Sequence, residues 1–544
     1  MPAFTPEERE LLEKYVTSAT DNVFAVNGLP GLVGAVYARY SRAKGGFRET
    51  LLKEFIKEGN IDADKAQDLI ERVLIAFGDD SVGELEGAHV SFEGISMIAT
   101  KELEDRRIGG SPIEISTRYV TYDRRDDDGN YLYIRPDEIM ASKHAEAYTD
   151  TMDFIFDTYA ELVGPMQDYF KRLKPLNSAE YDIDGDGRKE KFADLTDEND
   201  IKAFRRTYKM DIRTKACDTL RYILPLSTKA NMGIFGNGRF FQGVLSHCYT
   251  SPIPEVRRIA EKAHQALDRH IPRYVQRAKH NEYTDTNRSR MTTLTKDLTS
   301  DIEHDTDGYI ALTDRANDQE EADVRTIASM LYQYADTSLN QLCGRVSDMQ
   351  PEERQVIIDT YVGDRRSRRD RPGRAFESDY PYLFDMLTDW GTYKDLMRHR
   401  MTTQIRQKFS PLLGFSMPPD LENAGFADRA RKCHERATEL YERLLPDFPE
   451  EASYATLHGS KVRWMIGFND REAFHLLELR TIPQGHASYR KASQEMHRLI
   501  AERSPWRAEV MNHVDHNDYA WARADSEARQ RVKERALERS GLQI

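Results

Sequence analysis

The most regular pattern of apolar and polar positions lies in the second half of the chain. Apolar residues recur there at helical spacing, and they are Met386, Leu387, Trp390, Tyr393, Leu396 and Met397. This spacing predicts an amphipathic helix with one face in a core. Three basic residues, Arg398-His399-Arg400, follow directly and so fall at its C-terminal end. Such residues either complement the helix dipole or bind a diphosphate or an anionic heteroaromatic ring.

The rest of the pattern is also mainly helical. Thr5-Pro6-Glu7-Glu8 forms a capping box with proline at the first helical position, so a helix is expected from here to about Val16. Two more helices are expected at 34–58 and 63–76. The segment 278–300 is polar, rich in Thr, Asn and Lys, and lacks such periodicity, which predicts a linker.

Composition limits the classes of protein that fit. A chain of 544 residues and 62.9 kDa predicts two to four domains. Its net charge of −14 argues against a general nucleic-acid binder, which needs cations to neutralise phosphates. The sequence shows neither an apolar run of membrane-spanning length nor a secretory signal, so we expect a cytoplasmic protein without a membrane partner.

Four scattered cysteines, Cys217, Cys248, Cys343 and Cys433, fit reduced thiols. Their spacing forms neither a metal site nor a disulfide framework. No cysteine stands beside a plausible base, so an activated thiolate is not expected. We therefore expect an organic cofactor and no metal ion.

Two charged segments each allow two interpretations. Asp182-Ile-Asp-Gly-Asp-Gly-Arg188 alternates oxygens like a calcium loop, but it lacks a glutamate at the twelfth position, which favours a polar turn. The basic run from Asp364 to Arg374 suits either a nucleotide phosphate or a solvated loop, and the loop is favoured.

The basic triplet belongs to a longer pattern. Arg398-His399-Arg400 precedes a loop rich in Thr and Gln, and this arrangement resembles the signature of the flavin-dependent thymidylate synthases. The segment ending at Arg480 is similar to the family's second motif, in which Asn469-x-Arg471 opens a helix and Leu479-Arg480 closes it. The resemblance implies that the triplet, Asn469 and Arg471 bind FAD, and that Arg480 is the catalytic arginine that contacts the pyrimidine.

The first half carries segments that resemble the same family. They are Ser81-Val82, Glu93 to Ser96, Ser116 to Tyr119, Arg221-x-x-Leu-Pro-Leu226 and Asn237-x-Arg239. The triplet of this half is Asp105-Arg106-Arg107, and an aspartate there repels a diphosphate. Cys248 stands where this half would have the equivalent of Arg480. The resemblance implies flavin contacts for Asn237 and Arg239, and substrate contacts for Ser116, Arg118 and Arg221.

These repeated motifs indicate an internal duplication. We expect a mixed α+β fold, mostly helical, in which each copy has a small sheet flanked by helices. The first copy spans 1–280 with an insertion at about 130–210, a linker covers 281–305, and the second copy spans 306–544. A short strand at 308–313 is expected to open the second copy.

The two copies retain different parts of the family's site. The first keeps Ser116, Arg118 and Arg221 for the nucleotide phosphate, whereas the second has Lys408 near the usual serine and Ser453 in place of the arginine. Lys408 is our substrate-binding candidate in the second copy. The family consists of homotetramers that share active-site residues, so the resemblance implies a homodimer that imitates the tetramer, with about one flavin per chain.

The activity that the resemblance implies is reductive methylation of dUMP to dTMP by a flavoenzyme, with methylenetetrahydrofolate and NADPH as co-substrates. The rewritten loop at 402–410 leaves another pyrimidine nucleotide open as the substrate. A non-catalytic nucleotide-binding homologue is the third possibility. His486 stands at a family Ser-His-Ala motif, and it either contacts the Leu-Arg helix or ligand or has a structural role.

Overall fold

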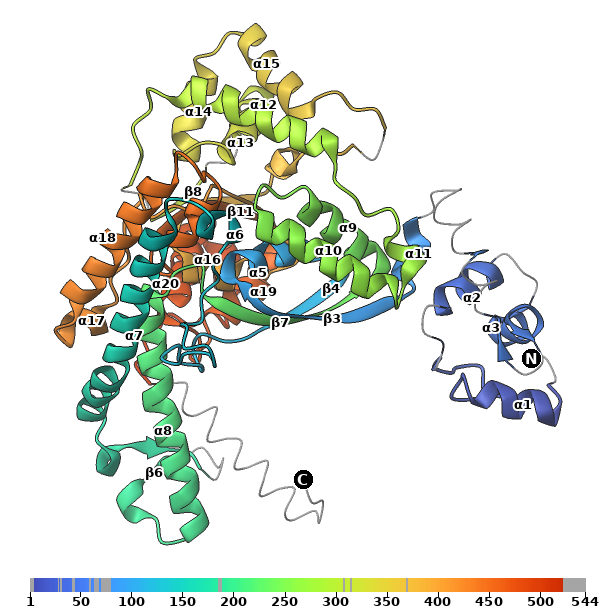
Figure 1. The fold of residues 1–544 in the computed structure, drawn as a ribbon, viewed down its shortest axis with the longest axis horizontal. Coiled ribbons are helices and arrows are strands. Elements are labelled where there is room, and N and C mark those ends of the chain that lie inside the picture. The colour runs from blue at the N-terminus through green and yellow to red at the C-terminus, as the bar shows by residue number, and fades with distance from the viewer. Residues whose placement is uncertain are drawn as a thin grey trace. The chain divides into compact units, whose positions relative to one another are not determined.

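The computed structural model describes residues 4–27, 29, 32–41, 45–57, 60–62, 68–69, 80–183, 188–306, 309–313, 316–367 and 370–521 (Figure 1). It is a mixed α/β structure in which helices surround small sheets, as expected. The chain forms two compact units. Unit 1 comprises Met1–Ile95, Ala99–Glu114 and Ala230–Asp285, and unit 2 comprises Ser96–Ile98, Ile115–Lys229 and Thr286–Ile544.

Unit 1 is built on a three-stranded sheet with the order β3-β7-β4. The strands are β3 (Gly87–Ser96), β4 (Gly110–Glu114) and β7 (Lys229–Asn237). Alternate residues of β7, including Met232 and Ile234, are buried, so this strand has one face in the core. The helices of this unit after β7 are α9 (Gly238–Tyr249), α10 (Pro254–Asp268) and α11 (Pro272–Val275).

The N-terminal helices follow local signals. The expected capping box is present, because Thr5 and Glu8 cap α1 (Pro6–Glu13) reciprocally. The helix expected at 34–58 is divided into α2 (Val33–Tyr40), α3 (Phe47–Thr50) and a π-helical turn, Leu51–Phe55. Gly46 caps α3 in an extended conformation, which breaks the helix. The helix expected at 63–76 lies outside the described residues except for 68–69.

Unit 2 is built on a four-stranded antiparallel sheet with the order β10-β11-β9-β8. The strands are β8 (Ile310–Leu312), β9 (Tyr382–Asp389), β10 (Thr403–Arg406) and β11 (Lys461–Phe468). β8 confirms the expected strand at 308–313. Leu383, Ile405 and Met465 of the sheet share a core with α13 (Gln319–Tyr332), α14 (Leu339–Ser347) and α15 (Pro351–Val362).

The helix predicted through Met386 and Leu387 was wrong in its first half. Both residues lie on β9, and the helix, α16 (Trp390–Leu396), begins only after Asp389. Every residue of β9 is buried, so apolar side chains point to both faces of the sheet and hide the two-residue period. Asp389 caps α16 by accepting a hydrogen bond from the Thr392 backbone N–H at 2.9 Å. The basic triplet does follow the C-terminal end of this helix.

The expected insertion contains two long helices, α7 (Ala145–Leu173) and α8 (Glu198–Leu220), which pack together. A small hairpin, β5 (Glu180–Tyr181) and β6 (Glu190–Lys191), joins them. It shares a core with α8 that includes Tyr181 and Phe204. Residues 184–187 of the expected polar turn lie outside the described residues.

The segment expected as a linker contains α12 (Glu282–Thr299), which is anchored by the buried Met291. Leu294 and Leu298 pack against the same core, so the helical spacing is present but is confined to three apolar residues of an otherwise polar segment. The other elements are α5 (Met97–Glu104), α6 (Asp137–Met140), α17 (Pro419–Asn423), α18 (Ala427–Leu444), α19 (Asp470–Arg480), α20 (Ala487–Arg503), α21 (Pro505–Glu509), β1 (Ile56–Lys57) and β2 (Asn60–Ile61).

The same order of elements occurs twice along the chain. The first series is β3-α5-β4 and then β7-α9, and the second is β9-α16-β10 and then β11-α19. In both sheets the last strand of the series lies in the middle. An asparagine caps the helix that follows each of these strands: Asn237 is the last residue of β7, and Asn469 directly follows β11. This repetition supports the duplication proposed from the motifs.

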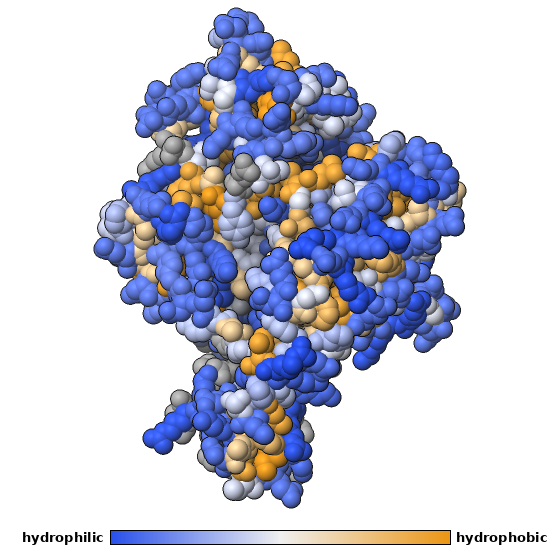
Figure 2. Space-filling view, turned by 90° about the vertical axis from the view of Figure 1, so that its left-hand side faces the viewer, coloured by the Kyte–Doolittle hydropathy of each residue, from blue (hydrophilic) through white to orange (hydrophobic). Residues whose placement is uncertain are grey.

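The face drawn in Figure 2 is mostly hydrophilic, with smaller hydrophobic areas between the charged ones. None of the helices in the described ranges is both long and apolar enough to cross a membrane.

Candidate functional site

A carboxylate on α16, Asp395, lies at the centre of a basic cluster in unit 2. Burial raises the pKa of Asp395, but Arg221, Arg398, Arg480 and Lys394 together hold it below its usual value. The charge of Asp395 also acts on Arg118. Five cationic side chains therefore surround one carboxylate, and they come from both halves of the sequence.

Arg118 is held by a second carboxylate. Its Nε and Nη2 donate to the two oxygens of Asp218 at 2.6 and 2.7 Å. Burial disfavours both charges, but each partner stabilises the other, so the pKa of Arg118 is raised and that of Asp218 is lowered. Ser116 supports the loop, because its Oγ accepts from the Arg118 backbone N–H at 3.3 Å.

Arg221 is the most deeply buried member of the cluster, with 1% of its surface exposed. Its Nη2 lies 3.7 Å from Asp395 Oδ2. Among the described residues, Arg221 Nε, Arg221 Nη2 and Asp395 Oδ2 have no hydrogen-bond partner. An unpaired buried polar group costs about 1–3 kcal/mol, so these atoms indicate a place for a bound polar or anionic group.

The backbone after Arg221 explains why this arginine is buried. Arg221–Ile223 is a 3-10 turn, and the extended residues behind it pair with a segment of the other half. Leu226 N–H donates to Thr456 O, and His458 N–H donates to Leu224 O, both at 2.8 Å. The Leu-Pro-Leu part of this family motif is thus paired, through its backbone, with a segment from the other half of the sequence.

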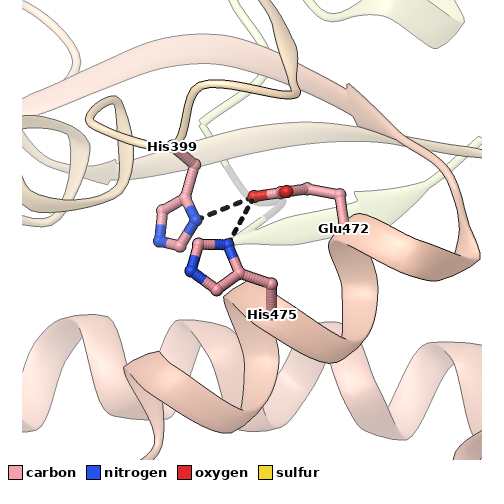
Figure 3. A group of neighbouring side chains, drawn as sticks. All are labelled: His399, Glu472 and His475. Carbon is pink, nitrogen blue, oxygen red and sulfur yellow. Dashed lines mark hydrogen bonds and ion pairs between the residues drawn. The ribbon is translucent and has the colours of Figure 1, made fainter. Parts of the chain in front are cut away.

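A chain of hydrogen bonds links the basic triplet to α19 (Figure 3). Arg480 Nε donates to His399 Nε2 at 2.8 Å, and His399 Nδ1 donates to Glu472 Oε1 at 2.9 Å. Burial and Arg480 lower the pKa of His399, although Glu472 opposes this, so the ring is neutral at neutral pH. Asn469 begins α19 as expected, because its Oδ1 accepts from the Glu472 backbone N–H at 3.1 Å.

The remaining predicted residues differ in their surroundings. Arg398 is the exposed member of the cluster, Arg400 is also exposed, and Arg471 is exposed on the first turn of α19. Lys408 is partly buried and forms an ion pair with Glu450 at 3.2 Å. Its role as a substrate ligand stays a prediction.

Two of the residues predicted to bind the flavin, Asn237 and Arg239, belong to unit 1, whereas the residues of the basic cluster belong to unit 2. Asn237 caps α9 by accepting from the Phe240 backbone N–H at 2.8 Å, and Arg239 forms an ion pair with Glu84. In the same unit Lys101 is fully buried between Glu104 and Glu114, whose carboxylate lies 3.0 Å away. Lys101 corresponds to Lys394 of the cluster when the two triplets are aligned, but in unit 1 this lysine is paired with two buried carboxylates.

His486 is a helix cap as well as a neighbour of the cluster. Its Nδ1 accepts from the Ser488 backbone N–H at 3.2 Å at the start of α20, and its Nε2 lies 3.4 Å from the Asp218 carbonyl. Burial lowers the pKa of His486 to about 3, with Arg221 acting in the same direction. The structural role is therefore present, next to the arginine cluster.

Sequence reasoning missed Asp218, Asp395, Glu472 and His458. Asp218 and Asp395 could have been found from the sequence, because each precedes a predicted arginine by three residues. On a helix this spacing puts the aspartate and the arginine on the same face. His458 is fully buried with both ring nitrogens unpaired among the described residues, and burial lowers its pKa. No local pattern marks it.

A separate hollow of about 550 Å³ lies along α20 and is lined by residues that include Tyr309, Lys491, His497 and His516. It shares no residue with the basic cluster. We choose Asp395 as the centre of the candidate site because cations cluster around it and because buried atoms of Arg221 and Asp395 lack hydrogen-bond partners among the described residues.

The described residues form a mixed α/β protein with an arginine-rich cluster to which both halves of the sequence contribute side chains. The family model described as thymidylate synthase complementing protein matches residues 32–273 and 312–506, and the chain belongs to this family. It is similar to UPF0159 proteins of Chlamydia pneumoniae and Chlamydia muridarum, each 34% identical over 97% of this chain and 98% or 99% of the relative. A UPF0159 protein of Thermoplasma acidophilum is 31% identical over 92% of this chain and 98% of its own.

Proposed function

We propose that the chain is a flavin-dependent thymidylate synthase-like enzyme, which converts dUMP to dTMP with methylenetetrahydrofolate and NADPH as co-substrates. The observation that carries the proposal is the convergence of five cationic side chains on Asp395. Arg118 and Arg221 come from the first matched region, and Arg398, Arg480 and Lys394 come from the second. A site of this charge favours a small anionic nucleotide within an otherwise acidic chain.

The nucleotide phosphate is assigned to Arg118 and Arg221. Asp218 fixes the plane of the Arg118 guanidinium, so this side chain is oriented before a ligand binds. Arg221 offers buried donors, Nε and Nη2, that the described residues do not use. Arg480 is assigned to the pyrimidine, where a guanidinium stabilises negative charge that develops on a ring carbonyl.

FAD is assigned to Arg398, His399, Arg400, Asn469 and Arg471. The donor set fits its diphosphate, because three exposed guanidiniums flank the start of α19 and the end of α16. When bound, the flavin supplies the reducing equivalent that the reaction needs. The chain's own residues bind the two ligands, orient them and keep the imidazole of His399 neutral.

The cysteines of the chain support chemistry without a thiolate nucleophile. Burial raises the pKa of Cys217 to about 12 and that of Cys343 and Cys433 to about 11, and it also raises the pKa of Cys248. All four are therefore protonated thiols at neutral pH, which are poor nucleophiles.

We propose one working site per chain, with the first copy at 1–280, a linker at 281–305 and the second copy at 306–544. Two chains would then form a homodimer that imitates a tetramer of single copies. The buried ion pairs around Lys101 support the loss of the equivalent site in unit 1.

The test begins with the visible absorbance spectrum of the purified chain and its flavin content after denaturation. About one flavin per chain and folate-dependent conversion of dUMP to dTMP are expected. If the chain converts a different pyrimidine nucleotide and not dUMP, that nucleotide replaces dUMP as the proposed substrate. A colourless protein that cannot rescue a thymidine-requiring strain would overturn it in favour of a non-catalytic nucleotide-binding homologue.

A further inference from the structure

The hydrogen-bond chain Glu472–His399–Arg480 contains a residue with no assigned role. Glu472 is 6% exposed and His399 is 3% exposed. A buried carboxylate is costly unless it is paired, and the Glu472 carboxylate is bonded to His399 at 2.9 Å with His475 Nδ1 at 3.4 Å. Figure 3 shows these two contacts of Glu472. Its partner His399 in turn accepts a hydrogen bond from Arg480.

The directions of these bonds follow from the chemistry of the groups. A guanidinium only donates, so His399 Nε2 must accept from Arg480 Nε. The single proton of the neutral ring therefore lies on Nδ1, where it is donated to Glu472. A second proton, on Nε2, would face the Arg480 N–H and break the chain.

We propose that Glu472 is a positioning residue: it holds the His399 proton on Nδ1, so that Nε2 fixes the Arg480 guanidinium for an anionic pyrimidine nucleotide. The proposal rests on the function proposed above for Arg480. It assigns to the glutamate an action through two other side chains, without contact with the ligand.

The first half of the chain supplies an internal comparison. Counting from Asn237 and from the triplet, the positions of Glu472, His399 and Arg480 are held there by Phe240, Arg106 and Cys248. All three members are replaced together in unit 1. This is expected if the glutamate serves only to orient the arginine, because it has no function once the arginine is lost.

A metal site is the competing interpretation of the same side chains. One nitrogen or oxygen of each of His399, Glu472 and His475 lies within 4.8 Å of the others, a spacing that suits a metal ion. A metal on Nδ1 would need the lone pair there and would move the proton to Nε2, against Arg480. The positive charge of Arg480 beside the ring also opposes a cation.

The first experiment measures the tautomer in the full chain without added ligand. Nitrogen NMR of histidine-labelled protein, assigned with His399→Gln, should show Nδ1 protonated and Nε2 unprotonated. Glu472→Ala should abolish this preference, Glu472→Gln should retain part of it, and Glu478→Ala on the same helix should leave it unchanged. Protonation of Nε2 in the wild type, or a shift of Nδ1 on addition of Zn²⁺, would overturn the proposal.

The second experiment measures dUMP affinity by calorimetry in the same variants. Glu472→Ala should bind about tenfold more weakly, the size of one lost charge-assisted hydrogen bond, and Glu478→Ala should bind as the wild type does. Normal affinity in a folded Glu472→Ala variant, or in Glu472→Leu if the alanine variant does not fold, would overturn the positioning role, because neither side chain can accept from His399 Nδ1. If the wild type does not bind dUMP, the proposed function fails, while the tautomer measurement still decides the role of Glu472.

Discussion

Arg221 and Asp395 face each other with 3.7 Å between Nη2 and Oδ2, and neither atom has a hydrogen-bond partner among the described residues. A direct charge-assisted hydrogen bond would bring such atoms to about 2.8 Å. The arginine is buried behind the end of α8, and the aspartate is carried by α16 of the other half. The separation leaves the guanidinium able to bind a ligand while the aspartate limits the cost of its burial.

Arg221→Met tests whether this arginine serves binding rather than stability. The variant should lose at least about 30-fold in dUMP affinity, since loss of one partner of a buried charged contact costs about 2–5 kcal/mol. Its melting temperature should fall only slightly, because Asp395 keeps the other cations that act on it. Calorimetry and thermal unfolding measure the two quantities.

Arg239→Met is the control, because Arg239 pairs with Glu84 in unit 1. A lower melting temperature with unchanged dUMP affinity in Arg221→Met would assign the arginine to structure instead.

Asp218→Asn tests the clamp on Arg118. Loss of a buried, paired carboxylate should lower the free energy of unfolding by about 3 kcal/mol at neutral pH. Because the folded pKa of Asp218 lies below its ordinary value, the stabilisation is complete above the ordinary aspartate pKa and is lost as the pH falls towards the folded pKa. Urea unfolding should therefore show a difference between variant and wild type that shrinks towards about pH 3. A difference independent of pH would contradict the assignment.

Local signals in the sequence predicted the local parts of this structure. The capping box at Thr5, the strand at 310–312 and the helix from Asn469 to Arg480 are all present. Each depends on residues within one or two turns, where side chains compete directly for backbone groups. The family motifs identified the arginines that converge on Asp395, although their ligands stay predictions.

Interactions over long sequence distances were not predictable in the same way. The apolar spacing at Met386 and Leu387 predicts a helix although both residues lie on β9, because burial on both faces removes the alternation that marks a strand. The tautomer of His399 depends on Glu472 and Arg480, which lie 73 and 81 residues away. The pairing of 224–226 with 456–458 joins the two halves of the chain, and no local pattern encodes it.

His486→Asn tests the buried histidine that caps α20. The folded pKa of His486 is about 3, which lies below the ordinary histidine pKa of about 6.5. Between these two pH values only the unfolded chain binds a proton at His486. The wild type should therefore lose stability across this range as the pH falls. Asparagine keeps an N-cap oxygen but does not titrate, so the variant should lose less stability over the same range. Equal acid sensitivity in urea unfolding would argue that His486 is not buried in its neutral form.

Lys101→Met and Lys394→Met form a matched pair, because each lysine precedes the last residue of its triplet by six positions. Lys101 lies between Glu104 and Glu114, so its loss removes the ion pair of two buried carboxylates and should cost about 3–5 kcal/mol of stability. Flavin content and dUMP affinity should not change in the surviving folded protein. Lys394 acts on Asp395, and its loss should weaken dUMP binding about tenfold, with a smaller effect on stability. If Lys101→Met instead lowered the flavin content per chain, unit 1 would hold a working site and the proposal of one site per chain would be wrong.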